Sequence, residues 1–370
     1  MATSVIKRKL CEVCEIVSGT TPKTGIKEYW DGDLNWITPA EISENDIFIK
    51  ETERKITLKG AESCSLRLMP KGTVLFSSRA PIGKVAIADN PMYCNQGFKN
   101  FICSDIIFNK YLYYFLKYNH DYLNSLGRGA TFKEISKSII SQVEILLPNI
   151  ETQRQICKKL DNITKQIHLK KKQLQKYDLI VKSQFSEMFE NKKFERVLLS
   201  EVIDYEQPTK YIVASENYKD EYETPVLTAG KSFILGYTNE TEGIYNGSIN
   251  PTLIFDDFTT DCKYVDFDFK VKSSAMKLLH LRNNNEQILY YFYAINKIRF
   301  KPENHQRHWI SKFANFTIEK PPIEQQTQFA NFVKHIDKLK FHENITLFKK
   351  LCYNILSIKK LNTLREVKNG

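Results

Sequence analysis

Apolar side chains between residues 150 and 190 recur at the spacing of an α-helix. They stand at positions 156, 160, 163, 167, 174, 177, 181, 185 and 188, and Lys170 occupies the one position that interrupts the stripe. No glycine or proline occurs between Pro148 and Lys193, so the pattern predicts one helix of about 40 residues, roughly 60 Å long. Asn149 is the expected N-cap. A helix of this length needs a second helix against which to pack.

A second apolar stripe follows Pro321 and ends the chain. Its spacing is looser, and Glu343 interrupts it. Because the two stripes are similar in length, we predict an intramolecular, antiparallel coiled coil that also serves as a partner interface. The predicted seam includes Ile156, Leu160, Ile163, Ile167, Leu174, Phe329, Val333 and Ile336.

The segments ahead of the two helices have a different pattern. Short β-prone runs alternate with turn residues, and each segment contains one helical stretch, at 109–119 and at 286–296. No βαβ rhythm is present, so the expected fold class is α+β, with two similar globular domains joined by two long antiparallel helices. The predicted boundaries are 1–146 for the first domain, 147–193 for the central helix, 194–319 for the second domain and 320–370 for the last helix.

The chain repeats its own sequence in the same order. Pro148 aligns with Pro321 and Glu151 with Glu324 at an offset of 173 residues. Upstream, the tetrapeptide Leu-Tyr-Tyr-Phe occurs at 112–115 and again at 289–292. Two copies of one unit suit a target with two half-sites, and DNA is the commonest target of that kind.

The positive charge of the chain lies mainly on the predicted helices. The formal net charge is +11, and residues 151–192 hold ten basic and five acidic residues, while residues 321–370 hold nine and four. Lysine on a helix is often only a solvated face. The same surplus also fits helices that lie along a polyanion, or beside a partner that does.

Composition indicates an ordinary cytoplasmic protein. No window approaches about 18 uninterrupted apolar residues, so no membrane span is expected. The N-terminal residues lack the apolar segment of a secretion signal. The eight cysteines are scattered along the chain, which is typical of reduced thiols in a cytosol.

The sequence contains no catalytic motif that can be followed through. Gly230-Lys231-Ser232 matches the end of a phosphate-binding loop, but Pro225 stands where that loop needs glycine. The tetrapeptide Asn-Pro-Pro-Tyr/Phe of amino-methyltransferases is absent. Cys11 and Cys14 form a lone pair without a second pair at zinc spacing. His305 and His308 favour a polar contact in a basic loop over a metal site. We therefore expect no catalytic residue and no metal ligand.

Turns of the globular segments carry polar and basic side chains in groups. Arginine and lysine donate hydrogen bonds to guanine, and asparagine and glutamine pair with adenine. Turns are normally rich in such residues, so a single group is weak evidence, and the repetition of the domains strengthens it. The candidate DNA-binding residues are Thr21, Lys23, Ser78, Arg79, Lys84, Asn95, Gln96, Lys99, Arg128, Lys133, Lys231, His305 and Arg307.

The whole chain resembles the specificity (S) subunit of type I restriction-modification systems. Residues 16–42, the run Arg-Ala-Pro-Ile-Gly at 79–83 and Asn-Gln-Gly at 95–97 look like the family's first target-recognition domain. Residues 147–160 and 183–189 are similar to its conserved helical region. The resemblance implies a non-catalytic subunit that binds double-stranded DNA at a bipartite target.

The resemblance also implies partners and cofactors outside this chain. In that family the S subunit docks two methyltransferase (M) subunits and, in the full enzyme, two motor-nuclease (R) subunits, and the product is N6-methyladenine. The helices act as a ruler for the gap between half-sites. S-adenosylmethionine, ATP and Mg are expected in the partner subunits, and no cofactor is expected in this chain.

The second domain departs from the family pattern. It lacks clear copies of the Gly-Thr-Thr-Pro and Arg-Ala-Pro-Ile-Gly motifs, and Asp256-Asp257 stands where the first domain has Ser77-Ser78. The two halves are therefore expected to read different sequences, which gives an asymmetric target. Two alternatives stay open: a self-contained restriction-methylation enzyme, and a coiled-coil scaffold that does not bind DNA.

Overall fold

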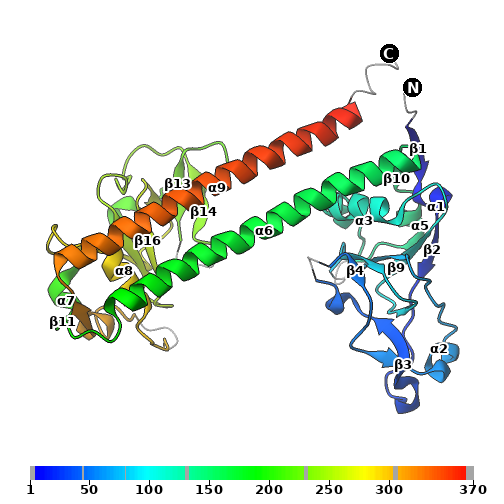
Figure 1. Cartoon of the computed structure of the whole chain (residues 1–370), viewed down its shortest axis with the longest axis horizontal. Coiled ribbons are helices and arrows are strands. Elements are labelled where there is room, and N and C mark those ends of the chain that lie inside the picture. The colour runs from blue at the N-terminus through cyan, green and yellow to red at the C-terminus, as the bar shows by residue number, and fades with distance from the viewer. Residues whose placement is uncertain are drawn as a thin grey trace. The chain divides into compact units, whose positions relative to one another are not determined.

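The structure is a computed structural model that describes residues 5–43, 46–79, 81–129, 133–228, 232–302 and 307–363, with side chains described as far as residue 343. The chain divides into two compact units, Met1–Gln166 and Ile167–Gly370, and each is described by itself (Figure 1). Both units mix helices and strands, which confirms the α+β prediction.

The first unit contains the first domain and the beginning of the central helix. Its elements are β1 (Ile6–Lys9), α1 (Leu10–Val13), β2 (Cys14–Ser18), η1 (Lys27–Tyr29), β3 (Trp30–Ile37), η2 (Pro39–Glu41), β4 (Phe48–Ile49), β5 (Lys55–Ile56), α2 (Leu58–Ser63), β6 (Val74–Phe76), β7 (Val85–Ala88), β8 (Tyr93–Cys94), β9 (Lys99–Cys103), α3 (Asn109–Tyr118), α4 (His120–Ser125), α5 (Lys137–Ser141), β10 (Glu144–Leu147) and the first part of α6 (Ile150–Phe189).

Two sheets form the body of this unit. The larger has the strand order β2-β9-β6-β7-β4, and the smaller has the order β5-β3-β8. Every residue of β6 and β7 is buried, because the unbroken apolar runs of these two strands are covered on both faces. Helix α3 packs on β6 and β7, which places it between the sheet and the long helix α6.

The second unit contains the rest of α6 and the second domain. Its further elements are β11 (Glu195–Leu198), α7 (Leu199–Val202), β12 (Ile203–Glu206), η3 (Pro208–Tyr211), β13 (Thr224–Leu227), β14 (Ile234–Thr238), β15 (Thr252–Asp256), β16 (Cys262–Val265), β17 (Lys270–Val271), β18 (Met276–Leu281), α8 (Ile288–Asn296), η4 (Phe313–Asn315), β19 (Thr317–Lys320) and α9 (Ile323–Thr363).

The second domain repeats the topology of the first. Its four-stranded sheet has the order β12-β18-β15-β16, which matches β2-β9-β6-β7, and its three-stranded sheet β14-β13-β17 matches β5-β3-β8. In both small sheets the central strand pairs antiparallel with one neighbour and parallel with the other. The repeat seen in the sequence is therefore a repeat of fold, and the prediction of two similar globular domains is confirmed.

A two-stranded ribbon closes each domain at its base. Strand β1 pairs antiparallel with β10, so that Ile6 lies opposite Leu147. Strand β11 pairs antiparallel with β19 in the same way, with Glu195 opposite Lys320. The first and last strands of each domain therefore lie side by side, and a long helix follows directly after the last strand. This pairing holds the loops of the domain at a fixed position relative to that helix.

The ends of α6 follow the local sequence signals. The side chain of Asn149 accepts a hydrogen bond from the backbone N–H of Thr152 at 2.8 Å, which confirms the predicted N-cap. Beyond the last turn, Asn191 has a positive φ of 62°. Asparagine tolerates this left-handed conformation better than most residues, and it commonly ends a helix.

A buried glutamine near the start of each long helix fastens the helix to its domain. The side-chain oxygen of Gln153 accepts from the backbone N–H of Phe108 at 2.7 Å, and its amide donates to the carbonyls of Ile106 and Pro148 at 2.9 and 2.8 Å. Gln326 repeats this with the N–H of Gln287 at 3.0 Å and the carbonyl of Pro321 at 2.9 Å. Phe108 and Gln287 are the N-cap residues of α3 and α8.

The first turns of α6 also bind the first domain. We expected the apolar stripe to pack against another helix, and in addition Gln153 and Asp161 on this part of α6 bind the first domain. The Asp161 carboxylate accepts from the Lys110 amine at 2.8 Å and from the Tyr114 hydroxyl. Of the predicted seam residues in this unit, Leu160 is buried, and Ile156 and Ile163 are half-buried. The polar partners on α3 explain why the helix has a second packing face here.

Helices α6 and α9 run antiparallel and side by side in the second unit (Figure 1). Phe185 of α6 meets Phe329 of α9, with ring centroids 5.3 Å apart, and further along both helices Lys170 pairs with Glu343. Of the predicted seam residues, Phe329, Val333 and Ile336 are buried, and Ile167 and Leu174 are half-buried.

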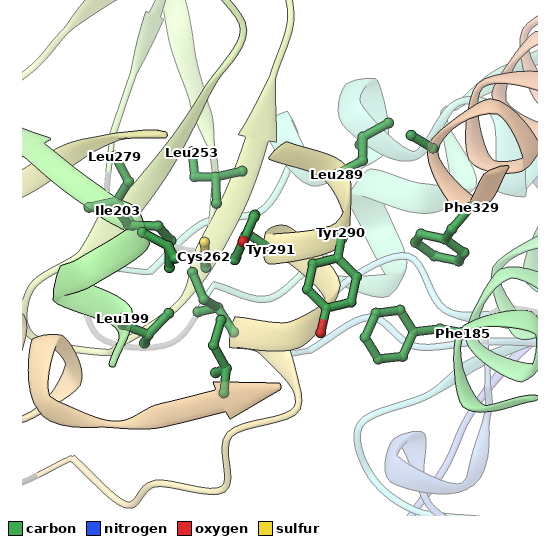
Figure 2. Packing of buried hydrophobic residues seen from close by; sticks show 14 of the residues in the cluster. Phe185, Leu199, Ile203, Leu253, Cys262, Leu279, Leu289, Tyr290, Tyr291 and Phe329 are labelled. Carbon is green, nitrogen blue, oxygen red and sulfur yellow. The ribbon is translucent and has the colours of Figure 1, made fainter. Parts of the chain in front are cut away.

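The largest aromatic cluster of the second unit joins these two helices to α8. Figure 2 shows Phe185 and Phe329 facing Tyr290 of α8. The ring of Tyr290 stacks on that of Phe185 at 5.7 Å, and Phe329 is fully buried. Packing of such rings makes a large contribution to stability, so the second domain and its helix pair form one core.

The two polar interruptions of the helical stripes meet each other. Lys170 and Glu343 form an ion pair, and the amide of Gln173 donates to the other carboxylate oxygen of Glu343 at 3.4 Å. A half-buried polar pair in an apolar seam penalises every alignment that separates its members. We therefore assign this pair the role of fixing the register of α6 against α9.

Leucine substitutions at Lys170 and Glu343 are expected to show how this pair affects the stability of the helix pair. Lys170→Leu combined with Glu343→Leu is expected to raise the thermal unfolding midpoint, because the seam becomes continuous, whereas Glu343→Leu alone is expected to lower it. The ion pair lowers the pKa of Glu343. The ion pair therefore contributes to the free energy of unfolding at pH values above the ordinary glutamate pKa. This contribution is lost as the pH falls through the lowered pKa of Glu343. Unfolding scans at neutral and acid pH measure both effects, with Lys171→Leu on the exposed face as the control.

Candidate nucleic-acid interface

Four loops of the first domain carry the residues that the sequence singled out. We name them loop 1 (19–23), loop 2 (77–84), loop 3 (95–99) and loop 4 (127–134). They contain six basic residues and a single carboxylate. Hydrogen bonds between them show that the loops meet at one end of the domain.

Loop 1 packs directly on loop 3. The side-chain amide of Asn95 donates to the Thr21 hydroxyl at 3.3 Å, and the backbone N–H of Thr20 donates to the carbonyl of Cys94 at 2.9 Å. A Cβ atom at Gly19 would lie 2.0 Å from the Asn95 carbonyl oxygen. Only glycine permits this approach, which explains the glycine at the start of loop 1.

Ser78 joins loop 2 to loop 3 and to Ile135, the residue that directly follows loop 4. Its backbone N–H donates to the Gly97 carbonyl at 2.8 Å, and its own carbonyl accepts from the Ile135 N–H at 2.9 Å. Its hydroxyl donates to the same Gly97 carbonyl at 3.2 Å. The side chain is fully buried, so Ser78 holds the loops together from inside the domain.

Lys99 lies inside the domain as well. Its amine pairs with the Glu134 carboxylate at 3.2 Å, and its side chain is only 8% exposed. A contact between this amine and DNA would require breaking that ion pair in a buried site. The structure therefore corrects the assignment of Lys99 from a DNA contact to a residue that anchors loop 4.

The remaining candidates of the first domain face the surface. Lys23, Gln96, Arg128 and Lys133 are exposed, and Thr21, Arg79, Lys84 and Asn95 are half-buried. The amine of Lys84 donates to the Pro39 carbonyl at 2.8 Å, which directs this side chain along the domain. Since Lys99 already pairs with the only carboxylate of the four loops, the exposed surface there is positively charged, as a phosphate-binding surface requires.

The second domain contains the same loop junction, built from different residues. The N–H of Asp257 donates to the Ala275 carbonyl at 3.3 Å, and the Asp257 carbonyl accepts from the His308 N–H at 2.9 Å. These two bonds correspond to the two backbone hydrogen bonds of Ser78. The sequence motifs of this region are missing from the second domain, yet its backbone forms the same connections.

The second domain also contains a buried lysine, Lys277, but the carboxylate that pairs with it comes from a different position in the domain. Lys277 and Lys99 occupy equivalent positions in the two sheets. Lys277 lies two residues before Leu279, which pairs with Leu253. Lys99 lies two residues before Phe101, which pairs with Val74. The Lys277 amine is 3.6 Å from the Asp257 carboxylate, and both side chains are buried.

Because the Asp257 carboxylate offsets the charge of Lys277, the position of the second domain that is equivalent to Glu134 does not need a carboxylate. Arg307 precedes His308 as Glu134 precedes Ile135, and Arg307 is exposed. It is therefore the one predicted site residue of the second domain that the structure places beside the junction. The other two, Lys231 and His305, lie outside the described residues.

The two cysteines of the Cys11–Cys14 pair have different surroundings, because Cys11 is exposed and Cys14 is buried. Cys14 lies opposite Cys103 on the neighbouring strand, with the two Sγ atoms 3.9 Å apart. The hydrogen bond to Cys103, together with burial, raises the pKa of the Cys14 thiol. Nowhere in the described parts of the chain do three or more His, Cys, Asp or Glu side chains gather as metal ligands would.

Some residues of structural importance escaped the sequence reasoning. The hydrogen-bonding role of Gln153 and Gln326 was not predicted, although their equivalent places in the repeat were a signal for it. Asp257 was noted only as a departure from the first copy. Among the helices that the structure describes, none is long and apolar enough to cross a membrane.

Comparison with known proteins agrees with the duplicated architecture. A family described as "Type I restriction modification DNA specificity domain" matches residues 4–177 and again residues 191–347. The MjaIX specificity subunit of Methanocaldococcus jannaschii is 42% identical over 207 residues, which cover 54% of this chain and 48% of that protein. A type I restriction enzyme specificity subunit of Escherichia coli is 49% identical over 144 residues, covering 38% of this chain and 35% of that one. The chain thus matches about half or less of the length of these relatives.

Solved structures share the fold over nearly the whole chain. The S subunit of a type I restriction-modification system from M. genitalium has a TM-score of 0.55 at 16% sequence identity, covering 97% of this chain and 96% of that one. A chain from a study of complex assembly in a type I system has a TM-score of 0.57 at 15% identity, covering 97% of both chains. At such identities the likeness concerns the fold alone.

Proposed function

The chain belongs to the family of type I restriction-modification specificity subunits, and we propose that it selects the DNA sequence on which the other subunits of such an enzyme act. In this proposal the chain itself catalyses nothing. It binds double-stranded DNA and holds the catalytic partners at a chosen site.

One observation carries the proposal: the loop junction is built twice with the same backbone and different side chains. The bonds of Ser78 in the first domain recur at Asp257 in the second. A fold that keeps its backbone and varies the side chains at one end is suited to reading two different sequences. Base edges are read by side chains, whereas the backbone and the basic residues position the duplex.

Each domain is proposed to bind one half of a bipartite, asymmetric target. Residues 1–146 would bind one half-site through loops 1 to 4, and residues 194–319 would bind the other through the loops around Asp257 and Arg307. The five basic residues that the first set of loops contains besides the buried Lys99 support binding to phosphate. The different charges at Glu134 and Arg307 support different half-sites.

The long helices, residues 147–193 and 320–370, are proposed to space the domains and to dock the partners. Antiparallel packing of α6 on α9 in the second unit and the Lys170–Glu343 pair support a spacer of fixed register. The partners are two methyltransferase subunits and two motor-nuclease subunits, which would bring S-adenosylmethionine, ATP and Mg. The excess of basic over acidic residues on both helices fits acidic partners or nearby DNA.

An exchange of the second domain tests this proposal. Residues 199–316 are replaced with those of a relative, while the ribbon of β11 and β19 and the buried Gln326 are kept. Because Gln326 accepts a hydrogen bond from the backbone N–H of Gln287 in that region, a new domain with the same backbone can be held in the same way. Methylome sequencing of a host that expresses the hybrid with its methyltransferase should show one changed half of the motif and one unchanged half.

The matched control exchanges the first domain and should change the opposite half. A hybrid in which both halves change would show that the halves do not read DNA independently. A parent chain that directs no methylation at any motif would overturn the proposed function.

A further inference from the structure

Two tryptophans of β3 hold loop 1 in place. The indole N–H of Trp36 donates to the Thr20 carbonyl at 3.3 Å, and that of Trp30 donates to the Lys23 carbonyl at 3.3 Å. The two rings lie edge to face, with centroids 4.9 Å apart. Both are almost completely buried, so their positions are fixed by the core of the domain.

Arg54 lies over both of these rings. Its guanidinium carbon is 4.2 Å from the ring centroid of Trp30 and 5.1 Å from that of Trp36. The backbone of Arg54 is also held, because its carbonyl accepts from the Thr52 hydroxyl at 2.6 Å and from the Trp36 N–H at 3.3 Å. Attraction of a cation to an indole face, together with these bonds, restrains the side chain before any ligand arrives.

The hydrogen-bond donors of this guanidinium are available. Arg54 is exposed, and within the described parts of the chain no group accepts a hydrogen bond from its side chain. Arg67 of the same domain is different, because its guanidinium donates to the Glu15 carboxylate at 2.8 Å. A restrained guanidinium with free donors beside a predicted DNA-binding loop is arranged for a ligand with two adjacent acceptors.

We propose that Arg54 is a DNA-contacting residue of the first half-site, held for that purpose by Trp30 and Trp36. The inference rests on the proposed function. Its ligand is a pair of acceptors on the duplex, which either a phosphate or the N7 and O6 atoms of guanine can supply. The contact lies next to loop 1 and extends the surface formed by loops 1 to 4.

The contact belongs to the first half-site only. Trp36 of β3 pairs with Tyr93 of the parallel strand β8. The equivalent residue of the second domain is Val226 of β13, which pairs with Lys270 of the parallel strand β17. Without the tryptophan pair, the described residues of the second domain give no comparable support for an arginine. Loss of Arg54 should therefore leave the second half of the motif unaffected.

The test uses the chain in complex with its methyltransferase subunit and short duplexes that carry the motif identified by methylome sequencing. Arg54→Ala, Arg54→Lys and the control Arg67→Ala are compared in competition binding at several salt concentrations, and thermal unfolding midpoints are recorded. Arg54→Ala should weaken binding roughly tenfold, while Arg67→Ala, with the same change of charge, should not.

Arg54→Lys then distinguishes the two sources of the acceptors. If it rescues binding to all duplexes alike, the ligand is a phosphate. If it does not rescue, and one position in one half of the motif becomes relaxed, the ligand is guanine. Unchanged affinity and motif in Arg54→Ala would overturn the inference, with or without a lower unfolding midpoint, while sequence-specific binding by the parent complex would leave the proposed function intact. A parent complex without sequence-specific binding would overturn both.

Discussion

Replacing Gln153 with leucine is expected to destabilise the first unit by about 3 kcal/mol or more. Leucine has a similar volume but no polar atoms, so the N–H of Phe108 and the carbonyls of Ile106 and Pro148 lose the partner that they have at 2.7–2.9 Å. Each buried backbone group left without a partner costs about 1–3 kcal/mol. Urea unfolding measures the loss, and hydrogen exchange at Phe108 should locate it at the start of α3.

Gln155 provides the matched control two residues further along the same helix. Its side chain is exposed and makes only one contact, at 3.5 Å to Glu151, so Gln155→Leu is expected to change stability by less than about 0.5 kcal/mol. Gln326→Leu should reproduce the Gln153 effect in the second unit. Equal stability of the Gln153 and Gln155 variants would show that the hydrogen bonds of Gln153 do not fasten α6 to the first domain.

Replacing Asp257 with alanine is expected to destabilise the second unit by about 3–5 kcal/mol. The carboxylate accepts from the backbone N–H groups of His308 and Trp309 at 3.1 and 2.8 Å, and it lies 3.6 Å from the amine of Lys277. Removing it leaves a buried lysine without a counter-charge, which is the costly half of breaking a buried ion pair. Denaturant unfolding of the variant measures the effect.

Two further variants show which of these contacts matters. Asp257→Ala combined with Lys277→Met should recover part of the loss, because no uncompensated charge remains buried. The control Asp261→Ala removes a carboxylate from the exposed tip of the same hairpin and should have little effect. If the double variant is no more stable than Asp257→Ala, the ion pair is not the source of the loss.

The sequence by itself determined the plan of the molecule. Apolar spacing and the absence of glycine and proline are local properties, and they placed α6 and its N-cap Asn149 correctly. The repeat of letters between 147–163 and 320–336 indicated two copies of one unit, and the sheets of the two domains confirm it. Both signals are properties of the sequence itself, so they can be read before any contact is known.

Loop chemistry was only partly readable in advance. Clusters of glycine, asparagine, arginine and lysine marked the four loops of the first domain, which the fold brings together. The same clusters gave no information on burial: Lys99 and Lys23 look alike in sequence, but one pairs with Glu134 inside the domain and the other is exposed. Burial depends on what packs over a residue, and that comes from distant parts of the chain.

Tertiary structure alone decided the pairings that hold the molecule together. Lys170 and Glu343 each looked like a defect in an apolar stripe, and only antiparallel packing of α6 on α9 turns the two defects into one ion pair. The second loop junction was hidden for the same reason, because backbone hydrogen bonds at Asp257 depend on strand register and not on side-chain identity. A pattern along the chain records what each residue prefers, whereas partners more than a hundred residues apart are set by the fold.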